Sequence, residues 1–386
     1  MSTHPSSPQP AVDLDKEAGA GNRQLSGIYL QLATVLAIAI SAYAIYANAL
    51  SNTQEFYRNT TFLSGILILG FILFPFSARH ATRSFNRWDY LFIILTLVSY
   101  GYFYVNYVDL HVVRKSIPNA TDYVMAAIGI GVLFEAARRT TGYFIPGLAS
   151  FAILYALFGQ YFMGIFGHGG FSVERLLYRL FMTSEGIFGI TLSTASTAIV
   201  VFILFGAFLS VSGATALFND LALAAAGRRR GGPAQVAVIS SALTGSLSGS
   251  AVANVATTGT FTIPLMKSIG LSSRFAGAVE ATASTGGMIM PPIMGAAAFI
   301  MAGFLGISYT TIVIAAIVPA LLYYAALIMA IDLEAKKQGL KGINKENIPQ
   351  VRAVLKARGL LLLPLVIVIG TLLLGKTPIY AGFLGI

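Results

Sequence analysis

The chain has 386 residues, of which 56% are hydrophobic and only 10% are charged, and its formal net charge is +10. A soluble domain carries roughly a quarter charged residues, so this composition excludes a soluble globular protein and indicates an integral membrane protein. The absence of Cys excludes disulfides and cysteine nucleophiles. The basic residues fall in short loops between apolar runs, a distribution typical of membrane topology rather than of nucleic-acid binding.

The apolar runs are long and lack the alternation of strands, which predicts an all-α, multi-span helical bundle. Residues 1–25 are polar and are predicted to form a disordered N-terminal segment. The predicted membrane segments are 27–48, 60–77, 89–107, 122–137, 143–160, 190–212, 236–266, 275–305, 309–332 and 359–375.

A different kind of segment, residues 171–186, lies between the fifth and sixth spans. Leu176, Leu177 and Leu180 fall on one helical face, and charged residues surround the rest. This pattern predicts either an amphipathic helix in the membrane interface or a loop helix that packs on the protein.

The distribution of basic residues predicts the orientation of the chain. With the N-terminus in the cytoplasm, the predicted inside loops hold 19 of the 25 Lys and Arg residues. This asymmetry orients the chain by the positive-inside rule.

At the end of one span, Glu135 lies close in sequence to Arg138 and Arg139. We expect a structural or lipid-headgroup role for these three residues.

The segment 236–266 follows Arg228–Arg230 and precedes Lys267, and both basic sites are predicted to lie inside. The segment must therefore enter and return on the same side, which predicts a re-entrant helical hairpin with its tip near Ser248–Ser250. Non-helical backbone at membrane depth is tolerated only where it is buried in protein or lines an aqueous cavity.

The next span, 275–305, contains two interruptions. Gly286 and Gly287 lower the cost of unwinding, and Pro291 and Pro292 remove backbone donors and clash with the preceding turn. We therefore predict a discontinuous helix that is broken around 285–292. Thr282, Ser284 and Thr285 supply hydroxyls at the same depth as the carbonyls that the break frees.

A hairpin tip and a broken helix near the membrane midplane are typical of the binding site of a secondary transporter. The candidate site for sodium and substrate consists of Ser248, Gly249, Ser250, Asn254, Thr285, Gly286 and Gly287. The alternative for small residues in membrane helices is close packing, which we favour for Gly245, Ala251, Ala253 and Gly259. Glu280 is an ionisable residue within a span. It is therefore a candidate for a functional role, and the alternative is that it pairs with a neighbouring polar group.

Three long stretches closely resemble the fused permease of TRAP transporters of the TAXI type, in which a small and a large membrane subunit form one chain. They are SGSAVANVATTGTFTIPLMKSIG (248–270), GAVEATASTGGMIMPPIMGAAAFIMA (277–302) and EAARRTTG (135–142). The stretch FILFGAFLSVSGA (202–214) fits the same family, and the resemblance covers nearly all of the chain after about residue 25.

The resemblance implies a permease that imports organic acids with sodium through a prokaryotic inner membrane, by an elevator-like motion. A periplasmic solute-binding protein would deliver the substrate. In this scheme residues 26–165 are scaffold helices, residues 166–189 are a periplasmic or interfacial connector, and residues 190–386 are the first half of the transport region. The family's large part contains an inverted repeat, and no second hairpin motif follows, so we expect a C-terminally truncated chain.

Other functions are weaker fits. An intramembrane serine hydrolase needs a base beside Ser248, and no His follows His168. A channel needs a continuous pore, which a hairpin facing a broken helix does not suit. A carboxylate carrier that works without a binding protein stays open, as does proton coupling through Glu280. We expect no catalytic residue and no cofactor other than the coupling ion.

Overall fold

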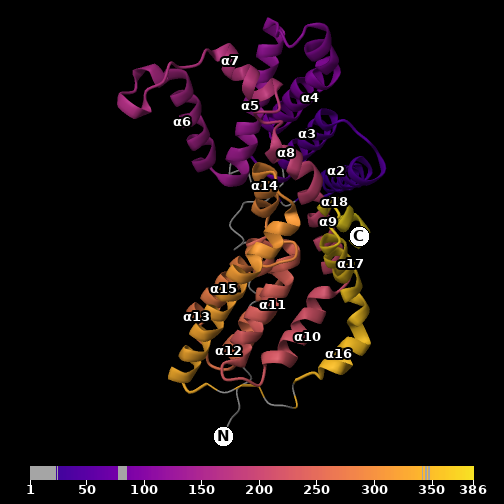
Figure 1. Cartoon of the computed structure of the whole chain (residues 1–386), viewed down its shortest axis with the longest axis vertical. Coiled ribbons are helices and arrows are strands. Elements are labelled where there is room, and N and C mark those ends of the chain that lie inside the picture. The colour runs from indigo at the N-terminus through magenta and orange to yellow at the C-terminus, as the bar shows by residue number, and fades with distance from the viewer. Residues whose placement is uncertain (1–22, 24, 77–84, 341, 344–345, 347) are drawn as a thin grey trace. The chain divides into compact units, whose positions relative to one another are not determined.

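The computed structural model describes residues 23, 25–76, 85–340, 342–343, 346 and 348–386, and every regular element within these ranges is a helix (Figure 1). The predicted all-α, multi-span fold is confirmed. The predicted disordered segment 1–25 lies outside the described residues except for Arg23 and Leu25, as does most of the predicted loop 78–88. Among the described residues eight helices are long and apolar enough to cross a membrane: Ile28–Leu50, Glu55–Leu73, Arg87–Val113, Ala120–Thr141, Phe144–Tyr161, Ile190–Val211, Tyr309–Lys337 and Val351–Leu373.

Contacts between the helices divide the chain into two compact units, and the division falls inside the first two spans. Unit 1 comprises residues 1–40 and 60–186, and unit 2 comprises residues 41–59 and 187–386. The helices of unit 1 are α2 (Ile28–Ile45), α3 (Glu55–Leu73), α4 (Arg87–Val108), α5 (Ala120–Thr141), α6 (Phe144–Phe158) and α7 (Val173–Leu177). Part of α2 and part of α3 belong to unit 2. A single π-helical turn extends each of α2, α4 and α7.

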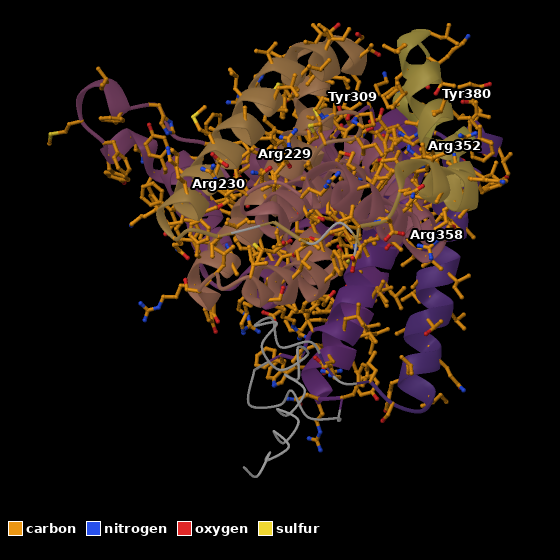
Figure 2. The ribbon with its side chains drawn as sticks, turned by 90° about the horizontal axis from the view of Figure 1, so that it is seen from below. Arg229, Arg230, Tyr309, Arg352, Arg358 and Tyr380 are labelled. Atoms are coloured by element: carbon orange, nitrogen blue, oxygen red, sulfur yellow. The ribbon has the colours of Figure 1, made fainter. Side chains whose placement is uncertain are left out.

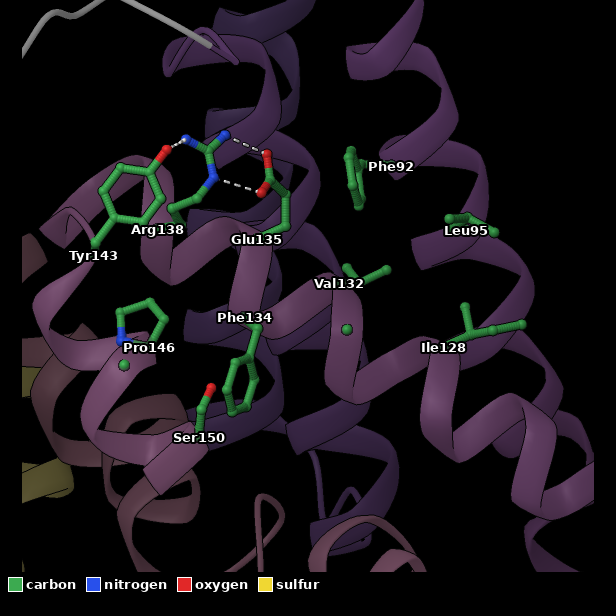
Figure 3. Close-up of a pocket in the computed structure, with 12 residues that line it drawn as sticks. Phe92, Leu95, Ile128, Val132, Phe134, Glu135, Arg138, Tyr143, Pro146 and Ser150 are labelled. Atoms are coloured by element: carbon green, nitrogen blue, oxygen red, sulfur yellow. Dashed lines mark hydrogen bonds and ion pairs between the residues drawn. The ribbon is translucent and has the colours of Figure 1, made fainter. Parts of the chain in front are cut away.

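A buried charge network stabilises unit 1 at one end of α5. Arg139 donates to Asp89 at 2.6 Å and to Glu135 at 2.8 Å, and Arg23 donates to Asp89 at 2.6 Å. Arg138 holds Glu135 with two hydrogen bonds of 2.7 Å, and its guanidinium also reaches the Tyr143 hydroxyl at the rim of a cavity of about 690 Å³ (Figure 3). Each buried carboxylate is therefore paired, as burial of a charge requires.

The segment after α7 packs on unit 1 through Phe181. Its ring is fully buried, with centroids 5.3 Å from Tyr100 and 5.1 Å from Phe103. The ring fits against α5 only because Gly129 has no side chain: a Cβ there would lie 2.3 Å from Phe181 Cζ. The Leu-rich face of this segment lines a cavity of about 350 Å³ with residues of α5 and α6.

Gly129→Ala is expected to lower the stability of unit 1 by about 1–3 kcal/mol, because the added methyl group overpacks the contact with Phe181. The matched control is Gly131→Ala in the same helix, where a Cβ meets nothing within 4 Å. Alanine favours helix over glycine by about 0.5–1 kcal/mol, so the control should be neutral or stabilising. Thermal unfolding of both purified variants checks this, and equal melting temperatures would contradict it.

Unit 2 holds the predicted hairpin and the predicted broken helix. Its helices are α8 (Ile190–Thr194), α9 (Val200–Val211), α10 (Ala214–Ala226), α11 (Gly232–Ser248), α12 (Ala251–Ser268), α13 (Ser273–Gly286), α14 (Ala296–Leu305), α15 (Tyr309–Lys337), α16 (Val351–Arg358), α17 (Leu363–Leu373) and α18 (Pro378–Gly385). Figure 1 shows α11, α12 and α13 side by side, in agreement with their many contacts.

Two regions that the sequence analysis treated as loops are partly helical. Residues 214–226 form α10, which the mid-helix polar residues Asn219 and Asp220 had concealed. Both have partners inside unit 2, since Asn219 Oδ1 accepts from Ser240 and Asp220 pairs with Arg358 at 3.3 Å. The second region is Val351–Arg358, which forms α16 ahead of the predicted last span.

The hairpin α11–α12 forms the centre of unit 2. Fourteen of the 17 residues of α11 are buried, so this helix has neighbours on nearly every side. The hairpin returns to the end of the unit from which it starts. The segment that follows α15 contacts both ends of the hairpin. Ile343 N donates to Gly227 O at 2.8 Å, just before α11 begins, and Leu340 packs against the core that contains Leu271, just after α12 ends.

Candidate functional site

The hairpin turns at the residues that the sequence analysis chose. Helix α11 ends at Ser248, and Gly249 takes a left-handed conformation with φ 61° that suits glycine. Ser250 then caps α12, and its hydroxyl accepts from Ala253 N at 3.3 Å. The Ser248 hydroxyl contacts the Ser250 backbone O and N at 3.4 Å, and these contacts do not activate it as a nucleophile.

The helix break begins and ends later than predicted. Helix α13 ends at Gly286, one 3₁₀ turn follows over Gly287–Ile289, and α14 begins at Ala296. The discontinuity thus spans 287–295 rather than 285–292. It includes both prolines, and the last residues before α14 also adopt non-helical backbone, with Met294 at φ 64°.

Three tyrosines of α15 satisfy the carbonyls at the break. Tyr323 donates to Thr282 O at 2.8 Å, and Tyr324 donates to Ala283 O at 3.0 Å. Tyr309 donates to the carbonyls of Pro292 and Ile293. The expectation that nearby hydroxyls would take this role was wrong for Ser284 and Thr285, because Ser284 donates to Glu280 and Thr285 donates to Ala281 O. These tyrosines lie 16 to 41 residues further along the chain than the carbonyls they bond, so they left no local signal in the sequence.

The hairpin tip and the break meet in space. A Cβ on Gly249 would lie 2.4 Å from Met294 O and 3.4 Å from Gly295 Cα. Deeper in the hairpin, a Cβ on Gly245 would lie 2.8 Å from Gly287 Cα. The two backbones thus touch without intervening side chains, which supports the packing interpretation of Gly245 and gives Gly287 a packing role too.

A cavity of about 340 Å³ lies where the tip meets the break. Ser248, Gly249 and Ser250 line it with Ile293 and Met294. Its remaining lining is apolar apart from backbone and comes from the π-helical turn before α9 and from α9, α11, α12 and α14: Ile199, Phe202, Ile203, Leu247, Ala253, Ala296 and Phe299.

Two helix N-termini open onto this cavity. Ser250 and Ala253 belong to the start of α12, and Ala296 begins α14. The first N–H groups of a helix lack intrahelical partners and carry the positive end of the helix dipole. The cavity therefore suits a small anion such as a carboxylate at its polar end, with apolar groups along α9.

Asn254 lies beneath the tip and is fully buried. Its amide nitrogen donates to Ser241 O at 2.8 Å, whereas its Oδ1 has no hydrogen-bond partner among the described residues. The buried Thr244 hydroxyl is also without one. A buried unsatisfied polar atom costs about 1–3 kcal/mol, and a neutral amide or hydroxyl oxygen is a suitable ligand for a hard cation.

Glu280 is the centre of a separate polar cluster. Its Oε1 accepts from Ser241 at 3.0 Å, from Thr258 at 2.5 Å and from Ser284 at 3.0 Å, and its Oε2 accepts from Thr262. The carboxyl group is fully buried and joins α11, α12 and α13. Glu280 was predicted as a candidate from the sequence, but its partners were not. Ser284, one turn later, and Thr262, four residues after Thr258, are the residues whose spacing could have indicated them.

The structure divides the predicted site residues into groups. Ser248, Gly249 and Ser250 line the cavity, and Asn254 and Gly287 meet around Gly245. Gly286 packs against α15, where its Cβ would lie 2.5 Å from Tyr323. Thr285 is exposed, and its hydroxyl donates to Ala281 O at 2.8 Å in its own helix.

Comparison with known proteins shows the family to which the chain belongs. The profile of a family described as "Tripartite ATP-independent periplasmic transporter, DctM component" matches residues 128–386. The chain belongs to the DctM family. The members of this family are membrane transporters, and this agrees with the expectation that the chain is not an enzyme. Together with the eight candidate spans among the described residues, the match confirms the prediction of a multi-pass membrane protein.

Curated relatives share the large-permease description. The C4-dicarboxylate TRAP transporter large permease protein DctM of Pseudomonas aeruginosa is 32% identical over 202 residues, which are 52% of this chain and 44% of the relative. A putative TRAP transporter large permease protein of Haemophilus influenzae is 34% identical over 150 residues, 38% and 34% of the two chains. The 2,3-diketo-L-gulonate TRAP transporter large permease protein YiaN of Escherichia coli is 29% identical over 176 residues, 45% and 40% of the two chains. The matches thus span less than half the length of these DctM-family relatives.

Proposed function

We propose that this chain is the membrane permease of a sodium-coupled TRAP transporter that imports small organic acids delivered by a periplasmic binding protein. The observation that carries the proposal is the convergence of two helix N-termini and the Ser-Gly-Ser tip on one cavity of about 340 Å³. Positive dipole ends favour the carboxylate of an organic acid, and no side-chain cation is needed.

Sodium is proposed to bind beneath the tip, with Asn254 Oδ1 as one ligand. This oxygen is buried and lacks a partner among the described residues, so a bound cation would satisfy it. The contact between Gly245 and Gly287 places the break beside it. Ordering of the tip by sodium would then prepare the substrate cavity, which gives the coupling of the two ligands a physical basis.

The wider arrangement follows the family. We propose a TAXI-type fusion in the prokaryotic inner membrane with a cytoplasmic N-terminus and a re-entrant α11–α12 hairpin. The scaffold is residues 26–165, and the transport region, from residue 190 onward, moves like an elevator. Two of the relatives are named as permeases for C4-dicarboxylates and for 2,3-diketo-L-gulonate, which are organic acids.

Uptake into proteoliposomes tests the proposal. The complete reading frame would be reconstituted with the binding protein encoded beside it, and a sodium gradient would be compared with a proton gradient at matched voltage. The proposal requires uptake that depends on both sodium and the binding protein. Uptake without the binding protein would favour a carrier that acts alone, and uptake driven by protons alone would redirect attention to Glu280.

Asn254→Ala is expected to abolish most of the sodium-dependent uptake and the stabilisation by sodium, because it removes the unpaired buried oxygen. The measurement is the shift in melting temperature between sodium and choline chloride, alongside uptake. The control is Asn106→Ala, a part-buried amide that bonds to Tyr102 O in its own helix in unit 1. An unchanged sodium shift in Asn254→Ala would exclude this ligand.

A further inference from the structure

A second groove in unit 2 lies far along α11 from the hairpin tip, at the helix start. Its volume is about 660 Å³. Arg229, Arg230 and Gln235 line one side, and the last turns of α15 line the other through Ala325, Ile328, Met329 and Leu333, together with Asp332. The groove thus joins a polar end to an apolar floor.

The two arginines have no ion-pair partner among the described residues. Both are exposed, and Gln235 Nε2 donates a hydrogen bond to the backbone oxygen of Arg230 at 3.1 Å. Asp332 is the acidic residue of the lining, so the groove carries a net positive charge. Figure 2 shows Arg229 and Arg230 beside each other and well apart from Arg352 and Arg358 of α16.

The apolar floor belongs to a membrane span. Helix α15 is one of the candidate spans, and Met329 and Leu333 are 64% and 61% exposed. The helix ends in Lys336 and Lys337, as expected where a span reaches the membrane surface. The arginines therefore lie near the depth of phospholipid phosphates, while the floor extends toward the depth of the acyl chains.

We propose that this groove binds an anionic phospholipid, with its phosphate on Arg229 and Arg230 and an acyl chain along α15. Guanidinium groups bind phosphate through paired, charge-assisted hydrogen bonds, and basic grooves beside membrane helices suit lipid headgroups. The bound lipid bridges the start of α11 and the end of α15. These elements already touch at Gly231, where a Cβ would lie 2.7 Å from Ala335 Cβ.

The test measures lipid binding directly and does not use transport. Delipidated protein in detergent is titrated with phosphatidylglycerol, phosphatidylcholine and glycerol phosphate, and binding is followed by native mass spectrometry and by melting temperature. We expect saturable binding of phosphatidylglycerol and weaker binding of phosphatidylcholine. The double variant R229Q/R230Q should bind phosphatidylglycerol about tenfold less tightly, because it loses the charge-assisted contacts.

Two further variants separate the groove from general surface charge. R352Q/K356Q removes the same charge from α16 and should bind like the wild type. Ala325→Trp keeps the charge but fills the floor, and should weaken phosphatidylglycerol binding. Since Arg229, Arg230 and Ala325 are exposed, all variants should stay folded, which gel filtration checks. Equal binding by R229Q/R230Q and wild type, an equal loss in R352Q/K356Q, or equal protection by glycerol phosphate alone would overturn the proposal.

Discussion

Glu280→Ala is expected to lower the melting temperature of the protein by about 10 °C. The substitution leaves a cavity and deprives four buried hydroxyls of a shared acceptor. Thr258 and Thr262 retain backbone carbonyls one turn earlier, at 2.8 and 3.0 Å. Ser241 retains the Thr258 hydroxyl at 3.0 Å, so the loss falls mainly on Ser284. An unsatisfied buried hydroxyl and a new cavity together cost about 3–5 kcal/mol, which corresponds to a shift of this size.

Glu280→Gln is the companion variant, because it keeps the volume and one acceptor oxygen. It should lose less than half as much stability as Glu280→Ala. Thr285→Ala is the control from the same helix, since its hydroxyl is exposed and bonds within α13. Scanning fluorimetry in detergent measures all three, and a melting temperature of Glu280→Ala within about 2 °C of the wild type would show that the cluster does not stabilise unit 2.

Gly287→Ala is expected to destroy uptake, because it separates the hairpin from the break. Its Cβ would lie 2.6 Å from Gly245 Cα, and backbone atoms on both sides leave no flexible side chain that could move away. The hairpin or the break must shift, which displaces the tip from the cavity. Such overpacking costs about 1–3 kcal/mol, so the protein should still fold with a lowered melting temperature.

Gly277→Ala is the matched control for this glycine. It lies in α13, ten residues earlier, and a Cβ there meets nothing within 4 Å. Uptake by Gly277→Ala should equal that of the wild type. If Gly287→Ala transported as well as Gly277→Ala, then the close contact between hairpin and break would not matter for the proposed activity.

The positions of the hairpin and of the break could be predicted because each depends on residues close together in the sequence. Ser248–Ser250 interrupt an apolar run, and Gly249 supplies the left-handed turn. Pro291 and Pro292 cannot continue a helix. The exact ends of the break depend on long-range contacts, and the prediction therefore missed residues 293–295.

The partners of polar groups were harder to predict than the elements that carry them. Tyr323 and Tyr324 lie 41 residues from the carbonyls that they bond, and neither tyrosine is unusual in a membrane helix. Helix α10 was missed for a related reason. Asn219 interrupts its apolar sequence, and the partner of this residue, Ser240, lies 21 residues away.

Helix α15 connects the two sides of the break between α13 and α14 through hydrogen bonds. Its tyrosines bind the chain on both sides of the missing helical turns, and the helix itself is continuous from Tyr309 to Lys337. Bending at the gap would require several of these bonds to break together. In any large movement, the segment from α13 to α14 would therefore travel with α15 as a single rigid part.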